Sequence, residues 1–157
     1  MISLFFRNLF FTALHPGIVV GLGPFWILGN EMKIEFDHPL KLHHYAGATV
    51  FVTGLIIMLV CIVSFALIGG GTLSPADPTK KLVAVGLYRF SRNPMYIGVM
   101  MMLIGEAVFF QSVALWGYSL CVFIAFNIFI IRVEEPRLRR DFGETYGKYC
   151  ERVRRWM

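Results

Sequence analysis

Residues 94–131 read PMYIGVMMMLIGEAVFFQSVALWGYSLCVFIAFNIFII, two apolar segments joined only by Gln111 and Ser112. Each segment, 94–110 and 113–131, is long enough or nearly long enough to cross a hydrocarbon core of about 30 Å as a helix. Because the link is so short, the two helices are expected to form a tight antiparallel hairpin. The residues before 94 and those after 131 should therefore meet at one end of it.

Two further apolar segments precede the hairpin, at about 5–28 and 45–68. The 157 residues are 57% hydrophobic and only 16% charged, whereas soluble domains carry about 25% charged residues. Four helices of about 20 residues, with their connections, would use nearly all of this length. The sequence therefore predicts an all-α polytopic membrane protein with about four transmembrane helices and one domain, residues 1–157. The first segment is too long for a cleaved signal, so it is predicted to be a retained span.

Positive charge gathers on one side of the predicted bundle. With four spans, the N-terminus, the loop 69–93 and the tail 132–157 share a side, which holds 13 of the 15 Lys and Arg residues. Lys33 and Lys41 fall on the other side. The positive-inside rule predicts that the N-terminus, the loop and the C-terminus are cytoplasmic.

The cysteines and histidines predict no metal or haem site. The three cysteines are scattered, and Cys61 and Cys121 lie within apolar spans, which fits neither a disulfide framework nor a zinc site. His15 lies toward one end of the predicted bundle, and His43 and His44 toward the other. A helical rise of about 1.5 Å per residue separates them by about 20 Å, which disfavours bis-histidine haem ligation within one chain.

The tail, RVEEPRLRRDFGETYGKYCERVRRWM, combines charge with helical periodicity. Gly143 is a possible weak point in the predicted amphipathic helix. This helix either lies on anionic lipid or folds back to close a site beside Arg92. The apolar positions that repeat at steps of three and four are Leu138, Phe142, Tyr146, Tyr149 and Val153.

The two cytoplasmic ends of the hairpin carry a polar cluster. Pro94 suits the first helical position and leaves the following amides free to bind an anion, and Glu134 and Glu135 can accept hydrogen bonds. Asn127 is expected to make an interhelical hydrogen bond or to face the same cavity as Glu134. An ordinary interfacial belt of arginines, tyrosines and glutamates is the competing interpretation. The cluster comprises Arg92, Asn93, Pro94, Tyr96, Arg132, Glu134 and Glu135.

These residues and their spacing resemble the membrane-embedded methyltransferases related to isoprenylcysteine carboxyl methyltransferase and the phospholipid N-methyltransferases. The resemblance covers roughly residues 70–155. Many relatives carry His where this chain has Asn93, so a base at that position is excluded here. The matching pieces are Leu82-Val83, Gly86-Leu87-Tyr88, Arg92-Asn93-Pro94-Met95-Tyr96-Ile97-Gly98, Glu134-Glu135-Pro136-Arg137-Leu138 and Phe142-Gly143-Glu144-Thr145-Tyr146-Gly147-Lys148-Tyr149.

The resemblance implies a pocket for S-adenosylmethionine at the cytoplasmic ends of the helices, with Arg132 and Glu135 toward the acceptor. From the residues themselves, Arg92 and the helix amides suit the cofactor carboxylate, Glu134 the ammonium or ribose, and the tyrosines adenine or the sulfonium. The expected cofactor-binding residues are Lys81, Leu82, Val83, Tyr88, Arg92, Asn93, Pro94, Tyr96 and Glu134.

Methyl transfer from a sulfonium requires alignment in a site protected from water, and a base only for a protonated acceptor. Glu134 or Glu135 would be that base. The acceptor is expected to be a lipophilic molecule from the bilayer. An isoprenylcysteine-like acid would use Arg132, and an aminophospholipid or small amine would use Glu135. The alternative class is a non-enzymatic lipid-binding helical module; no nucleic-acid partner is predicted, and the oligomeric state is left open.

Overall fold

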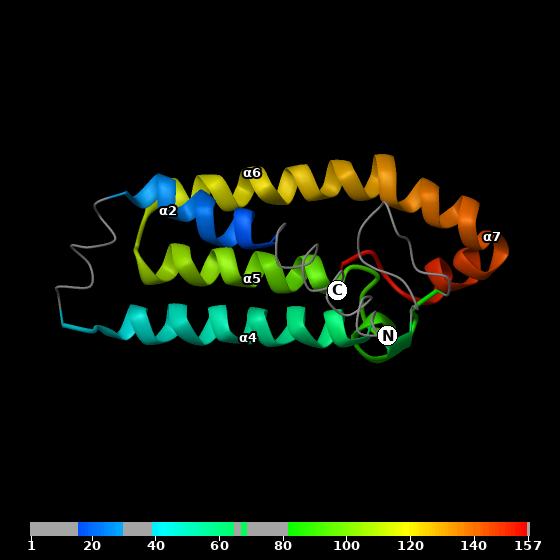
Figure 1. The fold of residues 1–157 in the computed structure, drawn as a ribbon, viewed down its shortest axis with the longest axis horizontal. Helices are drawn as coiled ribbons and strands as arrows, with labels where there is room; N and C mark the ends of the chain where they lie inside the picture. Colours follow the sequence, from blue (N-terminus) through cyan, green and yellow to red (C-terminus); the bar gives the residue numbers. More distant parts are fainter. Residues whose placement is uncertain (1–15, 30–38, 65–66, 69–81, 157) are drawn as a thin grey trace.

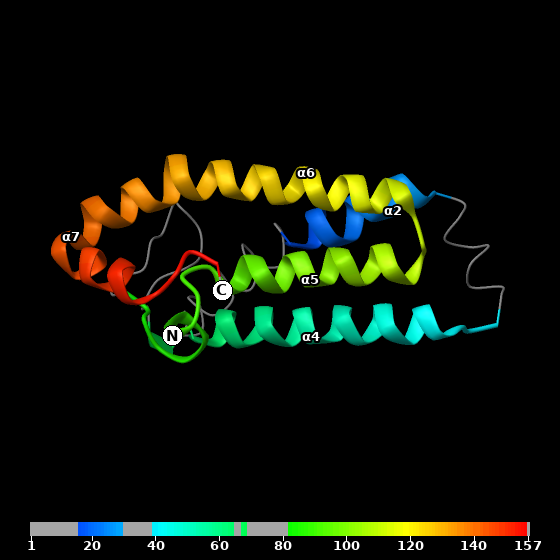
Figure 2. The ribbon, with the colours of Figure 1, turned by 180° about the vertical axis from the view of Figure 1, so that it is seen from behind.

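The computed structural model describes residues 16–29, 39–64, 67–68 and 82–156. The described part is helical and contains no strand, as the composition predicted. Its four longest helices are α4, α5, α6 and α7, and α5 lies between α4 and α6 (Figures 1 and 2). In chain order the elements are η1 (Gly17–Leu22), α2 (Gly23–Leu28), α4 (Leu42–Ser64), η3 (Gly86–Arg89), α5 (Pro94–Phe109), α6 (Val113–Phe129), η4 (Ile130–Glu134) and α7 (Glu135–Arg152).

The predicted hairpin is present. Helix α5 begins at Pro94 and ends with the Phe110 amide donating to the Glu106 carbonyl, 2.9 Å away. Gln111 then takes a left-handed φ of 51°, a conformation uncommon for a residue with a Cβ. Helix α6 starts two residues later and runs antiparallel to α5 (Figures 1 and 2). The hairpin brings the start of α5 level with the region where α6 passes into η4.

Helices α4 and α5 approach each other through paired glycines. A Cβ added to Gly54 would lie 2.5 Å from the Gly98 carbonyl oxygen, and one added to Gly47 would lie 2.6 Å from the Gly105 carbonyl oxygen. Only the absence of side chains permits this backbone approach, which is a common way to pack helices in membranes, where the hydrophobic effect does not drive helix association.

The outer faces of the long helices are apolar. Leu42–Ser64 and Val113–Arg152 each contain a segment long and apolar enough to cross a membrane, yet only 22% and 17% of the residues in those segments are buried. Core helices of a soluble protein would be mostly buried, so these faces suit lipid. The apolar helices Gly17–Leu28 and Pro94–Phe109 are shorter. The count of four spans and their orientation therefore remain predictions, and residues 5–15 of the first predicted span lie outside the described part.

The tail folds back on the bundle instead of extending from it. Gly143 has φ 52° and ψ −125°, which kinks α7, so the weak point that the sequence predicted is present. Beyond the kink the chain returns toward the start of α5 (Figures 1 and 2). There the Arg92 amide donates to the Arg154 carbonyl at 2.9 Å. Of the two interpretations of the tail, the fold-back beside Arg92 is present in the structure, and the site that it would close stays a prediction.

Candidate functional site

Two motif residues that are distant in sequence meet at the centre of the site. The Tyr96 hydroxyl, on the first turn of α5, donates to Glu134 Oε2 across 2.8 Å. The Tyr96 ring also packs edge-on against Phe126 of α6, with ring centroids 4.8 Å apart. The hairpin fixes the distance between these elements, and the hydrogen bond fixes one carboxylate oxygen of Glu134. The convergence that the sequence predicted is therefore present.

Glu135 lies beside two guanidinium groups. Arg155 grips its carboxylate with two hydrogen bonds, Nε to Oε1 at 2.8 Å and Nη2 to Oε2 at 3.0 Å. Arg92 Nη1 lies 3.3 Å from Oε1 and donates to Cys150 Sγ at 2.8 Å. Bidentate arginine–carboxylate pairs combine strength with fixed geometry. The structure thus places Glu135 in an ion cluster that ties α7 to the start of α5.

Residues 153–156, which we call the C-terminal clasp, lie against the residues that precede α5. The Arg155 carbonyl accepts hydrogen bonds from Ser91 Oγ at 3.1 Å and Asn93 Nδ2 at 3.0 Å. Trp156 Nε1 donates to Asn127 Oδ1 at 3.2 Å, and its ring lies 5.4 Å from that of Phe123. The clasp therefore joins α5 to α6. Asn93 bonds this backbone, and Asn127 bonds the clasp as well as the Phe123 carbonyl of its own helix.

The apolar part of the predicted pocket wall is packed behind the site. Tyr88 and Val83 are buried together with Cys61 of α4, and the Tyr149 hydroxyl donates to the Tyr88 carbonyl at 2.6 Å. Leu82 packs against the cluster of buried side chains formed by the tail. Lys81, also predicted to bind the cofactor, lies outside the described residues. These contacts fix the loop from residue 82 onward against α4 and α7.

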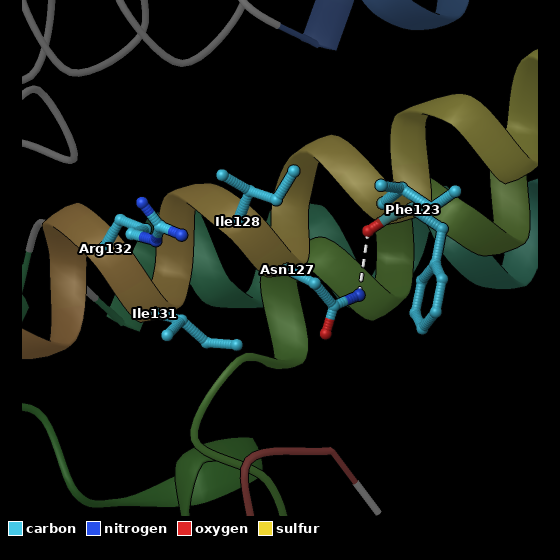
Figure 3. A pocket seen from close by; sticks show the side chains of 6 residues that line it. Phe123, Asn127, Ile128, Ile131 and Arg132 are labelled. Atoms are coloured by element: carbon cyan, nitrogen blue, oxygen red, sulfur yellow. Dashed lines mark hydrogen bonds between the residues drawn. The ribbon is translucent and has the colours of Figure 1, made fainter.

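Arg132 lies apart from the Tyr96–Glu134 pair, on an open groove of about 440 Å³ along the C-terminal half of α6 and into η4. Figure 3 shows the Arg132 and Asn127 side chains projecting on different sides of the helix. The groove combines an apolar wall with one amide and one guanidinium. It is lined by Phe123, Ile124, Asn127, Ile128, Ile131 and Arg132.

The two glutamates differ in their electrostatic surroundings. Burial raises the pKa of Glu134, although the Tyr96 hydrogen bond and the charge of Arg137 partly offset this rise. Burial also opposes ionisation of Glu135, but the hydrogen bonds from Arg155 and the charges of Arg92, Arg155 and Arg139 outweigh it, so the pKa of Glu135 is lowered. Glu135 is therefore a neutralised anion, whereas Glu134 would gain from a further positive group nearby.

The low pKa of Glu135 makes the clasp sensitive to acid. A carboxyl whose pKa is lower in the folded than in the unfolded state stabilises the fold above its ordinary pKa of about 4.3, and this stabilisation is lost as the pH falls through the folded value. We therefore expect the difference in Tm between the parent and Glu135→Gln to be constant from pH 8 to pH 5 and to shrink below about pH 4.3. A difference that stays the same at pH 3 would contradict the ion cluster.

Sequence reasoning did not identify the partners supplied by the clasp. Arg155 and Trp156 sit in a run of charged residues at the chain end, and no spacing indicates that they reach Glu135 and Asn127. Arg137 was visible inside the Glu134-Glu135-x-x-Leu138 motif but was given no role. Its i, i+3 spacing from Glu134 was the signal that could have drawn attention to it.

The fold and this polar cluster define a helical membrane protein with a site at one end of its long helices. The chain belongs to the phospholipid methyltransferase family, because the model of that family matches residues 42–145. The match includes α4, α5, α6 and the Tyr96–Glu134 pair, and it ends before the clasp. Membership at this level indicates a methyltransferase and confirms the resemblance drawn from the motifs.

The comparisons with individual proteins add little to the family assignment. An uncharacterized protein of Haemophilus influenzae is 29% identical over 63 residues, which are 40% of this chain and 100% of that protein. No solved structure matches the chain. The family is therefore the level at which the comparisons inform function.

Proposed function

We propose that this protein transfers a methyl group from S-adenosylmethionine, taken from the cytosol, to a lipophilic carboxylic acid taken from the bilayer. The observation that carries the proposal is the 2.8 Å hydrogen bond between Tyr96 and Glu134. It joins the two halves of the family motif at one point. The N-terminus of α5 and the ion cluster of Arg92 and Arg155 with Glu135 lie nearby. The family match supports methyl transfer as the reaction class.

The residues present fit such a cofactor. Arg92 Nε is buried and has no hydrogen-bond partner among the described residues, which leaves a donor available for an anion in a place where an unsatisfied group is costly. Glu134 offers a carboxylate to an ammonium or a ribose diol, and the Tyr96 ring offers a π face to a cation. When bound, the cofactor supplies an activated methyl group on its sulfonium.

The protein's own part in the reaction is positioning. Tyr96 and Glu134 are joined by a hydrogen bond, α4 and α5 pack closely through their paired glycines, and the clasp lies against the residues at the start of α5. Such a site aligns two reactants and excludes water, which together lower the barrier without covalent participation. A carboxylate acceptor arrives deprotonated at neutral pH, so no residue has to remove a proton from it.

Two observations favour a carboxylate acceptor over an amine. Both Glu135 oxygens accept hydrogen bonds from Arg155, so the residue predicted to hold an amine is already paired. Arg132 is exposed on a groove with an apolar wall, which suits a lipid chain that ends in an anion. The groove faces sideways from α6, where a molecule dissolved in the bilayer would approach.

The test is calorimetric titration of the detergent-purified protein with S-adenosylhomocysteine, the demethylated product. We expect saturable binding of about one per chain, weakened at least about tenfold in Glu134→Gln, because a charge-assisted contact is worth about 1.5–3 kcal/mol. Glu144→Gln is the matched control, since Glu144 is exposed and pairs only with Lys148, four residues on, in the described part. Equal affinity in Glu134→Gln and the parent would refute the site.

The acceptor is tested by methyl transfer in mixed micelles with radiolabelled S-adenosylmethionine. A prenylated cysteine acid and phosphatidylethanolamine are offered separately at the same concentration. We expect label on the acid, and its loss in Arg132→Gln. Label on phosphatidylethanolamine alone would show that the acceptor is an amine. Cofactor binding without transfer to either molecule would refute the proposed acceptor while leaving the cofactor site intact.

A further inference from the structure

Arg137 is a half-buried cation whose charge acts on Glu134 but which makes no hydrogen bond in the site described above. Its Nε atom is buried and has no hydrogen-bond partner, and the part of the chain that the structure describes offers Arg137 no ion pair within 4.0 Å. Leaving a charged donor buried without an acceptor costs free energy, so such atoms in a folded protein usually mark a missing ligand or water. Exposed neighbours on the same helix, such as Arg139 and Arg140, face no such constraint.

The position of Arg137 relates it to the Tyr96–Glu134 pair. It follows Glu134 by three residues on a continuous helical path from η4 into α7, a spacing that puts two side chains on one face. Glu134 in turn holds Tyr96 at 2.8 Å. The charge of Arg137 acts on Glu134, since it favours the ionised carboxylate. A carboxylate and a guanidinium with an unused buried donor thus share one helical face, three residues apart.

We propose that Arg137 and Glu134 together bind the α-amino acid end of the cofactor, Arg137 taking the carboxylate and Glu134 the ammonium. This inference rests on the proposed function. The carboxylate and the ammonium of an α-amino acid are carried by one carbon atom, so a protein that holds both needs an anion and a cation at neighbouring positions. Residues i and i+3 of a helix supply that arrangement.

This assignment replaces Arg92 as the principal carboxylate ligand. Arg92 already has Glu135 at 3.3 Å and Cys150 at 2.8 Å from its Nη1 atom, so its charge is balanced within the protein. Arg137 has no such partner among the described residues. A guanidinium whose charge is already paired gains less from a second anion than one that is buried without an acceptor.

The experiment compares two ligands that differ only in the carboxylate. S-adenosylhomocysteine carries both charges, and its decarboxylated analogue keeps the ammonium and lacks the carboxylate. Each is titrated calorimetrically into the parent, Arg137→Gln and Arg140→Gln. We expect Arg137→Gln to bind S-adenosylhomocysteine about tenfold to a hundredfold more weakly than the parent does, and to bind the analogue as the parent does. Arg140→Gln, on the exposed face, should match the parent for both ligands.

Other results would overturn the assignment. If Arg137→Gln weakens the binding of both ligands equally, or of neither, Arg137 does not bind the carboxylate. Should Arg137→Gln not fold, Arg137→Lys, which keeps the charge and loses the planar fork, is expected to give a smaller loss confined to the carboxylate-bearing ligand, and an equal loss for both ligands would again overturn it. If the folded parent binds neither ligand, the proposed function itself fails. A parent that binds both ligands equally refutes this inference alone.

Discussion

Replacing Gly54 by valine should destabilise the protein by about 3 kcal/mol, because the added side chain forces the two helices apart. A Cβ at this position lies 2.5 Å from the Gly98 carbonyl oxygen and 2.9 Å from the Met102 amide nitrogen. Both are backbone atoms of α5 and cannot rotate away. The only relief is a shift of α4 from α5, which separates the apolar residues packed between them. The free energy of unfolding in detergent, followed by circular dichroism, measures the change.

Gly117→Val is the matched control for this substitution. Gly117 lies within α6, and in the part of the chain that the structure describes a Cβ there meets nothing within 4 Å. The intrinsic cost of placing valine in a helix is the same at both positions, so it cancels in the comparison. We expect Gly117→Val to stay within about 0.5 kcal/mol of the parent. If the two variants lose equal stability, the close approach of α4 and α5 is wrong.

The second large effect is expected from deleting residues 153–157. The deletion removes Arg155, which holds both oxygens of Glu135, and Trp156, which bonds Asn127. Among the described residues, Arg92 is then the remaining ion-pair partner of Glu135 within 4.0 Å, and the Glu135 side chain is only 12% exposed. Breaking a buried ion pair costs about 3–5 kcal/mol, but Arg155 is 33% exposed, so we expect a loss of about 2 kcal/mol in stability.

The deletion should also weaken the binding of S-adenosylhomocysteine at least about tenfold, because residues 91–93 lose the carbonyl groups that position them. Titration calorimetry measures this loss, and unfolding in the same detergent shows whether the shortened chain is folded. Trp156→Phe is the control, since it keeps the ring beside Phe123 and removes only the indole donor. A folded, truncated protein that binds with the parent's affinity would show that the clasp has no part in the site.

The hairpin could be predicted because its determinants are local. Apolar length defines each helix, Pro94 marks the start of α5, and two polar residues leave room for nothing but a tight turn. The meeting of Tyr96 with Glu134 follows from that geometry, since antiparallel helices of similar length must align their ends. The kink at Gly143 was likewise indicated by a residue that readily takes a positive φ.

The glycine contacts were missed because small residues are informative only when a partner faces them. Gly17 and Gly21 in the first apolar segment have the spacing typical of packed helices, yet no atom of the described residues lies within 4 Å of a Cβ added to either. Gly54 and Gly98 are 44 residues apart in the chain, and no periodicity links them. Their pairing depends on how α4 and α5 are rotated and aligned, which is a property of the packed bundle.

Composition and the spacing within single segments were enough to predict the helical class, the apolar segments, the family motif and the end of the bundle where the polar residues gather. The three-dimensional packing was needed to show that the tail folds onto residues 91–93, that Arg155 binds the Glu135 carboxylate, and that Arg137 has a buried donor with no partner among the described residues. These facts depend on contacts between segments up to 64 residues apart. Chain spacing cannot specify such contacts, because they are selected by the packing of the whole fold.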